Sequence, residues 1–240
     1  MPEGTHRNRR RKDREKIVSA AFVLLCGCAG LVDPSETTLP PSLPLEIPAD
    51  QGGFRSLPVA CGASLPPLPA ARRYLGPPPE RINPNRTYRV VITTSCGELT
   101  IELDPARAPL GVNSVLFLVE QGFYAGSPFL TLEPGLLTRF GDPTGTGSGG
   151  PGYAVPAELP PDAGIYTTGA VLLAADGEAP LGSQLILVLG EQAPLQIAAT
   201  HPFLGRVVAG EETLDALNAI RVDESGTPEQ AAWVEQMQRP

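Results

Sequence analysis

Arg139 stands directly before the stretch FGDPTGTGSGGPGY at residues 140–153, which holds six glycines, two prolines and one aspartate. Glycine-rich loops bring backbone amides close to phosphate groups, so a nucleotide site is the first chemistry to test. The phosphate-loop motif requires a Lys-Ser/Thr pair after its glycines, and the dinucleotide motif requires a following helix. This stretch lacks the pair and is followed by YAVPAELPPD. It is therefore predicted to be a wide surface loop whose glycines adopt positive φ angles.

The charge distribution and the histidine count exclude other functions. Residues 1–16 carry seven of the 18 Lys and Arg, which leaves 11 Arg, no Lys and 23 acidic residues for the rest of the chain. A body this acidic repels nucleic acid, so no nucleic-acid partner is expected. With two histidines in all and no ligand spacing, we expect no metal site and no cofactor.

The basic N-terminal segment continues into IVSAAFVLLCGCAGLV, residues 17–32, an apolar run that ends in small residues. This order is typical of an export signal, and the run is short for a transmembrane helix. Leu-Cys-Gly-Cys at 25–28 resembles a bacterial lipobox, whose last cysteine is lipidated. We therefore predict a signal peptide at 1–28, lipidation of Cys28 and a lipid-anchored extracytoplasmic protein. The alternatives are an ordinary signal peptide, which gives a secreted protein, and an uncleaved single-pass anchor.

Once Cys26 is removed with the signal peptide and Cys28 is lipidated, two cysteines remain, Cys61 and Cys96. An exported domain enters an oxidising compartment, where two remaining thiols most simply form one disulfide. The alternative is two inert free thiols.

Two regions of different composition follow the signal. Residues 33–80 contain twelve prolines, and 29–86 is therefore predicted to be a semi-rigid, proline-rich extracytoplasmic linker. From residue 87 the pattern changes to alternating apolar residues, which predicts strands, and to apolar residues at helical spacing. Strands are expected at 87–94, 98–103, 170–174, 184–189 and 203–208, with helices beginning at 111 and 211.

GDPTGTGSGGPGY closely resembles the signature loop of the cyclophilin-type peptidyl-prolyl isomerases. The segments on either side agree in order, from GELTIELDPARAP to HPFLGRVVAGEETLDALNAI, so the resemblance covers residues 87–240. It is strongest to exported, membrane-tethered actinobacterial members. The resemblance implies a mainly β domain, a closed eight-stranded antiparallel barrel capped by two α-helices. The tail AAWVEQMQ is then expected to be the closing strand, because an open barrel would leave bare edges.

The resemblance also assigns catalytic positions. The family's Phe-His-Arg triplet falls on 129–131, so Thr131 replaces the catalytic arginine. A family glutamine on the neighbouring strand falls on Arg139, which we predict to reach across to the vacated position. The alternatives for Arg139 are a solvated charge or a pair with Glu98 or Glu133. Gln184 matches a catalytic glutamine of the family, and its alternative role is a hydrogen bond within the barrel.

The residues that the resemblance assigns to substrate binding are mostly apolar. The leucines and isoleucines among them suit a protein core whatever the function, and the histidine suits a half-buried ring as well as a ligand contact. The full set is Phe129, Leu136, Leu137, Ala174, Ala175, Ile186, Ile197 and His201.

The resemblance implies an isomerase that acts, as a monomer, on proline-containing segments of extracytoplasmic proteins. Because Thr131 lacks a guanidinium, weak activity is expected, and Thr131 leaves open whether the chain is an enzyme. The alternative is a catalytically inactive cyclophilin-like module that binds proline peptides or a cell-envelope partner, or serves as a scaffold. The residues Thr131 and Arg139 discriminate between the isomerase and the inactive module.

Overall fold

The structure is a computed structural model that describes residues 38–176 and 179–240. The predicted signal peptide at 1–28, with Cys28, lies outside the described residues. Thr38–Pro240 forms one unit by its contacts. In the described part of the chain, no helix is both long and apolar enough to cross a bilayer.

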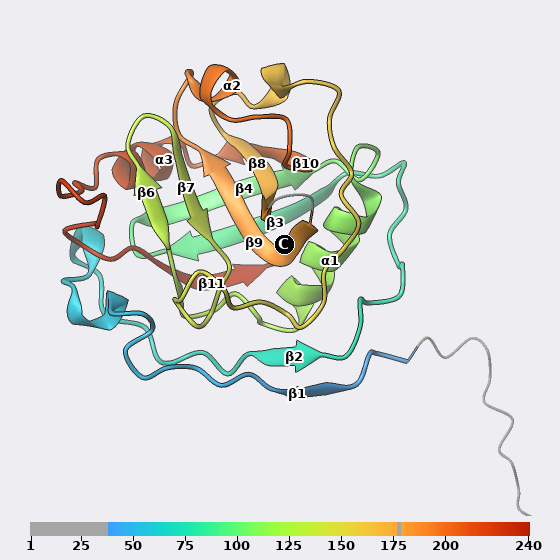
Figure 1. Ribbon diagram of the computed structural model, residues 1–240, viewed down its shortest axis with the longest axis horizontal. Helices are drawn as coiled ribbons and strands as arrows, with labels where there is room; N and C mark the ends of the chain where they lie inside the picture. The colour runs from blue at the N-terminus through green and yellow to red at the C-terminus, as the bar shows by residue number, and fades with distance from the viewer. Residues whose placement is uncertain (1–37, 177–178) are drawn as a thin grey trace, which may run out of the picture. The chain divides into compact units, whose positions relative to one another are not determined.

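More of the described residues lie in strands than in helices, as predicted (Figure 1). The strands are β1 Ser42–Pro44, β2 Arg72–Tyr74, β3 Tyr88–Thr94, β4 Gly97–Leu103, β5 Ser127–Pro128, β6 Thr131–Glu133, β7 Leu137–Phe140, β8 Ala170–Asp176, β9 Ala179–Val188, β10 Phe203–Ala209 and β11 Trp233–Gln238. The α-helices are α1 Pro109–Glu120, α2 Ala193–Gln196 and α3 Glu211–Asn218, and short 3₁₀ turns are η1 Phe54–Ser56, η2 Ala60–Gly62 and η3 Ala163–Ile165.

The main sheet is a curled, antiparallel half-barrel with the order β5-β11-β3-β4-β10-β8-β9-β7-β6. This corrects the prediction of a closed eight-stranded barrel, because the sheet has nine strands and its ladder ends at β5 and β6. The two end strands are pieces of one extended segment. Phe129 N–H donates to Ala232 O at 2.9 Å and the next amide, Leu130 N–H, donates to Arg139 O at 2.7 Å. Successive amides of an extended chain point to opposite sides, so this segment bonds to β11 on one side and to β7 on the other.

The hairpin of β3 and β4 confirms the first two predicted strands. Its register pairs Tyr88 with Leu103 at one end and Thr94 with Gly97 at the other. Buried residues alternate with more exposed ones along β4, as its sequence predicted. The predicted C-terminal strand is also present as β11, which pairs with β3.

Helix α1 is more deeply buried than an amphipathic helix, since residues 111–119 are all buried. Its outer face is covered by the preceding chain, where the Tyr74 ring lies 4.8 Å from that of Phe117. Ala108 at the helix start has no capping side chain. The carboxylate of Glu158 accepts instead from the amides of Leu110 and Gly111, at 3.1 and 3.0 Å. A distant side chain thus supplies the cap that the local sequence lacks.

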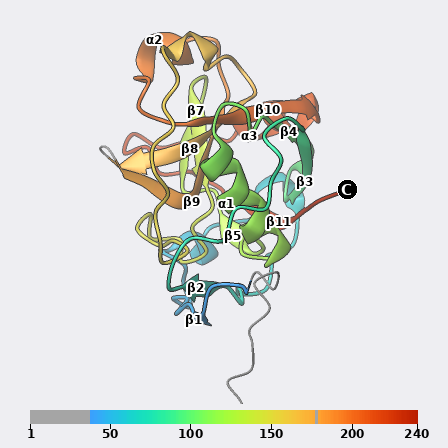
Figure 2. The ribbon, with the colours of Figure 1, turned by 90° about the vertical axis from the view of Figure 1, so that its right-hand side faces the viewer.

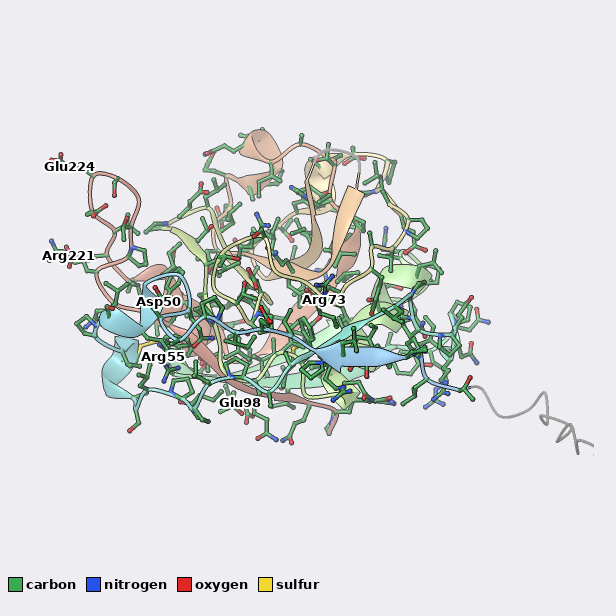
Figure 3. All side chains as sticks on the ribbon, turned by 60° about the horizontal axis from the view of Figure 1, so that its bottom comes forward. Asp50, Arg55, Arg73, Glu98, Arg221 and Glu224 are labelled. Carbon is green, nitrogen blue, oxygen red and sulfur yellow. A yellow bond between two sulfur atoms is a disulfide. The ribbon has the colours of Figure 1, made fainter. Side chains whose placement is uncertain are left out.

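Residues 38–86, here called the N-terminal strap, lie on the domain instead of extending away as the predicted linker. The strap forms the two-stranded pair β1–β2, and Ala60 N–H donates to Ala231 O at 2.9 Å. Figures 1 and 2 show β1 and β2 on the side of the molecule opposite α2. Figure 3 views this side, with Asp50, Arg55 and Arg73 marking the strap. Prolines limit the regular structure of the strap to short elements, but they do not prevent it from bonding to the half-barrel.

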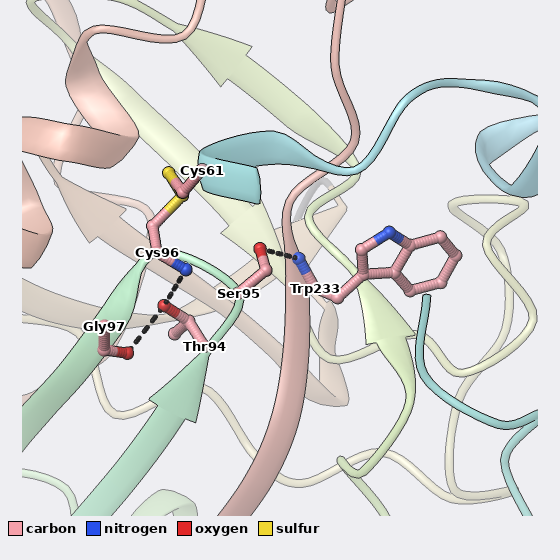
Figure 4. Close-up of a disulfide and its surroundings, with 6 residues drawn as sticks. All are labelled: Cys61, Thr94, Ser95, Cys96, Gly97 and Trp233. Atoms are coloured by element: carbon pink, nitrogen blue, oxygen red, sulfur yellow. Dashed lines mark hydrogen bonds between the residues drawn. A yellow bond between two sulfur atoms is a disulfide. The ribbon is translucent and has the colours of Figure 1, made fainter. Parts of the chain in front are cut away.

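A disulfide joins Cys61 of η2 to Cys96, with Cα atoms 5.1 Å apart and a sequence separation of 35 (Figure 4). Cys96 lies in the turn between β3 and β4. Next to it, Ser95 Oγ accepts from the backbone amide of Trp233 at 3.1 Å. The strap, the first hairpin and the last strand therefore meet at one point.

Candidate active site

A row of side chains crosses five neighbouring strands on one face of the sheet. Thr131 of β6 lies opposite Arg139 of β7, and Arg139 lies opposite Ile186 of β9. Ile186 in turn lies opposite Leu172 of β8, which lies opposite Phe203 of β10. Directly opposed residues of antiparallel strands share a face. The row is therefore polar at the β6 and β7 end and apolar at the other.

The apolar end belongs to a second hydrophobic core, separate from the main one. It holds Ala174 and Ile186, which are 1% and 4% exposed, and Ile197 at 8%. Leu136 and Leu137 pack against it and remain partly exposed. We call Leu136, Leu137, Ile186 and Ile197 the apolar patch. Branched aliphatic side chains of this kind suit contact with a small apolar ring.

The guanidinium of Arg139 is held by Gln184. Arg139 Nε–H donates to Gln184 Oε1 at 2.7 Å, and Nη2 lies 3.4 Å from Gly147 O. The amide of the fully buried Gln184 donates in turn to Gly147 O at 3.0 Å and Gly149 O at 2.8 Å. Both oxygens belong to residues 140–153, which we call the glycine loop. The loop therefore orients the glutamine, and the glutamine orients the arginine.

A buried carboxylate, Asp142, organises the glycine loop from within. It accepts from the amides of Thr144 at 2.8 Å, Gly147 at 2.7 Å and Gly149 at 2.9 Å, and from Thr144 Oγ1 at 2.6 Å. Hydrogen bonds from several donors are what allow a carboxylate to be buried. Gly147 and Gly149 thus give their N–H groups to Asp142 and their carbonyls to Gln184.

This arrangement explains why the loop needs glycine. A Cβ at Gly149 would lie 2.0 Å from Asp142 Oδ1, so no side chain fits there. Gly147 has a φ of 82° with open space around it, so glycine is favoured there by the backbone conformation and not by a lack of space. The prediction of positive φ angles is confirmed for Gly141, Gly145, Gly147 and Gly152.

His201 lies close to the arginine. Its Nδ1 accepts from the amide of Ala175 at 3.1 Å, which places the proton of the neutral ring on Nε2. Its carbonyl accepts from the hydroxyl of the buried Tyr166. Burial lowers the pKa of His201, and the positive charge of Arg139 lowers it further. Both effects favour a neutral imidazole beside a cationic guanidinium.

The structure brings together nearly all the predicted site residues, with one clear exception. Phe129 is 1% exposed in the main core, and its ring centroid lies 5.0 Å from that of Phe140. Phe129 therefore belongs to the main core of the half-barrel and not to the apolar patch. Thr131 remains half-buried at the row of side chains. Ala175 contributes its backbone amide to His201, and Gln184 bonds to the loop as well as to Arg139.

Two supporting residues, Asp142 and Tyr166, were not predicted from the sequence. An aspartate between glycines in GDPTGTG is a recognisable signal for a side chain that caps its own loop. The role of Tyr166 has no local signal, because its partner His201 is 35 positions away.

Comparisons with known proteins identify the family of this chain. The family model described as "Cyclophilin type peptidyl-prolyl cis-trans isomerase/CLD" matches residues 89–239. The chain belongs to this family, and these residues form its cyclophilin-type peptidyl-prolyl cis-trans isomerase domain.

Several relatives resemble the same region. Peptidyl-prolyl cis-trans isomerase B of Bacillus subtilis is 33% identical over 132 residues, which are 52% of this chain and 91% of that protein. Peptidyl-prolyl cis-trans isomerase-like 1 of Gibberella zeae is 31% identical over 145 residues, 59% of this chain and 88% of that protein. Peptidyl-prolyl cis-trans isomerase-like 2 of Cryptococcus neoformans is 35% identical over 140 residues, but the match spans only 24% of that protein.

Solved structures resemble the fold. A cyclophilin-type isomerase of Cryptosporidium parvum has a TM-score of 0.59 at 26% identity, covering 65% of this chain and 98% of that one. A structure of the same protein in the presence of the dipeptide Ala-Pro has a TM-score of 0.58 at 27% identity, covering 63% of this chain and 98% of that one.

Proposed function

We propose that the domain catalyses cis-trans isomerisation of X-Pro bonds and that Arg139 supplies the guanidinium missing at Thr131. The supporting observation is that Arg139 lies directly opposite Thr131 while its Nε is fixed by Gln184 at 2.7 Å. Rotation about the amide breaks no covalent bond, but its barrier is about 18–20 kcal/mol. The domain has only to stabilise the twisted amide.

A guanidinium and an apolar patch suit this task. The guanidinium is permanently charged and carries several directed donors, which can stabilise the twisted amide. Such donors contribute about 3–4 kcal/mol, or 10²–10³ in rate. The prolyl ring would rest on the apolar patch formed by Leu136, Leu137, Ile186 and Ile197. The neutral His201 adds no second positive charge beside the arginine.

We expect weak activity, for two reasons. Arg139 starts from β7 and not from the position of the family's arginine on β6, so its reach to the amide is different. The patch is aliphatic where the family has aromatic residues, and aromatic rings bury more area and add specific ring contacts. Both changes reduce stabilisation of the transition state.

We also infer that the domain acts outside the membrane on proline-containing segments of exported proteins. The basic, apolar and small-residue order of the first 32 residues supports export. The Cys61–Cys96 disulfide supports an oxidising compartment. Cys28 would then carry the lipid anchor, and the domain would act as a monomer. Mass spectrometry of the mature N-terminus tests this: a diacylglyceryl mass on Cys28 is expected, and an unmodified or uncleaved N-terminus would refute the anchor.

Exchange spectroscopy by NMR on an Ala-Pro peptide tests the activity. The protein should raise the cis-trans exchange rate above that in buffer, where isomerisation takes tens to hundreds of seconds. Chemical-shift mapping with the same peptide should perturb Leu136, Ile186 and His201. Binding at these residues without faster exchange would contradict the isomerase proposal and indicate a binding module.

A further inference from the structure

The N-terminal strap donates a hydrogen bond to the glycine loop near each end of the loop. At the first end, Gln51 Nε2 donates to Pro143 O at 2.8 Å. At the second end, Tyr74 N–H donates to Pro151 O at 2.7 Å. The part of the loop between these points contains Gly147 and Gly149, whose carbonyls hold Gln184. The strap lies outside the residues matched by the family model, which begin at 89.

The backbones of strap and loop are also in close contact. A Cβ at Gly52 would lie 2.2 Å from Gly145 O, and a Cβ at Gly145 would lie 2.2 Å from Gln51 O. At the other end, a Cβ at Gly152 would lie 2.6 Å from Tyr74 O. Glycines on both sides therefore permit two direct backbone contacts, and neither end of the loop can shift without displacing the strap.

Gln51 is built into this contact. Its side chain is fully buried, and its Nε2 also donates to Gly126 O at 2.9 Å. Its Oε1 accepts from Arg55 Nη1 at 3.0 Å. The residue has a φ of 43°, an uncommon backbone angle for a residue other than glycine. A buried amide with all these partners, held in an unfavourable backbone conformation, is retained only where the surroundings enforce it.

These contacts form a continuous chain of hydrogen bonds and backbone contacts from the strap to the site. Gln51 fixes Pro143 beside Asp142, Asp142 fixes Gly147 and Gly149, and those residues fix Gln184. Gln184 then holds Arg139 Nε. We propose that Gln51 is a positioning residue for Arg139, acting through the glycine loop. This inference rests on the proposed function, because it gives the strap a role in orienting the guanidinium that the proposed function uses.

The test compares Gln51→Met with the wild type in the full mature domain. Methionine has a similar length but donates no hydrogen bond, so Pro143 O and Gly126 O lose their partner. The expected results are a displaced Arg139 Nε–H resonance, a broader Gln184 side-chain amide signal and about a tenfold lower exchange rate at saturating Ala-Pro peptide. Peptide affinity should change little, because Gln51 does not contact the apolar patch. Gln51→Asn, which retains the amide and tolerates positive φ, should restore part of the rate.

Arg72→Ala is the matched control. Arg72 also lies in the strap and also bonds to a side chain, Ser42 Oγ at 2.8 Å, but it is exposed and has no role in the proposed chain. It should leave the rate and the Arg139 resonance unchanged. Unchanged Arg139 and Gln184 signals in Gln51→Met would overturn the positioning role, even if the wild type proved inactive and the proposed function failed separately.

Trp233 reports whether the strap stays in place. It is the only tryptophan in the sequence, and Arg55 of the strap lies over its ring at 5.7 Å. A shift of the Trp233 emission in Gln51→Met would mean that the strap has moved. In that case the proposal still predicts slower cis-trans exchange and a displaced Arg139 Nε–H resonance. A released strap with unchanged exchange and an unchanged Arg139 signal would contradict it equally.

Discussion

At the scale of single residues, the proposed function depends on Thr131 and Arg139. These residues lie opposite one another on β6 and β7, and the proposed function takes its guanidinium from β7. In the proposed function, Gln184 makes Arg139 effective because its Oε1 accepts from Arg139 Nε at 2.7 Å and so fixes the guanidinium. A long side chain without such a partner would lose much of its benefit to rotamer freedom.

Restoring the family's residue should raise the activity. Thr131→Arg places a guanidinium at the half-buried family position, and we expect the exchange rate on an Ala-Pro peptide to rise by about tenfold or more. Thr131→Lys is the control, since a lysine carries the charge without the planar fork of donors. Equal gains from both variants would mean that charge alone suffices, and no gain from either would contradict the assigned position.

The titration of His201 tests its distance from Arg139. Burial and the Arg139 charge both lower the pKa of His201, so Arg139→Ala should raise that pKa while burial keeps it below the ordinary value. NMR titration is direct, because the only other histidine is His6. An unchanged His201 titration in Arg139→Ala would show that the guanidinium lies elsewhere.

The same lowered pKa has a consequence for stability. The unfolded chain binds a proton at residue 201 more readily than the folded one does. The free energy of unfolding should therefore fall as the pH is lowered from about 6.5 toward the lowered pKa. In His201→Gln, denaturation followed across this range should lose that part of the slope.

At the scale of elements, the glycine loop supports the site through Gln184. Asp142 holds it from within, and its carbonyls hold Gln184. Gly149→Ala should therefore cost about 3 kcal/mol of stability, because the new methyl group displaces a buried carboxylate from its donors. Gly147→Ala, with open space around it, should cost about 1–2 kcal/mol for its positive φ alone. Urea denaturation measures both, and similar costs would argue against Asp142 as the organising group.

Strands with strong patterns were predictable from sequence, and short ones were not. The alternation in β3 and β4 and the helical spacing in α1 and α3 follow directly from the residue order. The short strands β5 and β6 have no hydrophobic pattern of their own. They belong to one extended segment, in which one amide bonds toward β11 and the next bonds to β7. Similarly, the place of Arg139 beside Thr131 followed from a family resemblance. Its contact with Gln184, and the anchoring of Gln184 to Gly147 and Gly149, were not predicted because they depend on distant loop geometry.

At the scale of the whole molecule, the strap is the main feature that sequence patterns concealed. Proline content predicted an extended linker, and proline content indeed prevents internal helices and sheets in most of the strap. What holds residues 38–86 to the domain is non-local: the buried Gln51, the contact of Tyr74 with Phe117, and the Cys61–Cys96 bond. None of these partners lies near its counterpart in sequence.

Reduction should loosen this assembly. Opening a loop of 35 positions removes a constraint on the unfolded chain that is worth about 3–4 kcal/mol. The double variant Cys61→Ser/Cys96→Ser should show this loss in denaturation experiments, together with a shift in the emission of Trp233, whose amide bonds to Ser95 beside the disulfide. Wild type treated with a reductant should become about as easy to unfold as the double variant. Equal stability of the oxidised wild type and the double variant would contradict the structural role of the disulfide.

The most direct test of the account is the exchange rate of an Ala-Pro peptide with wild type, Arg139→Ala and Arg206→Ala, measured at equal peptide saturation. Arg206 is an exposed arginine of β10 and serves as the control. The account predicts that wild type and Arg206→Ala accelerate exchange alike, while Arg139→Ala binds the peptide but loses about 10²-fold or falls to the buffer rate. Equal acceleration by wild type and Arg139→Ala would contradict it.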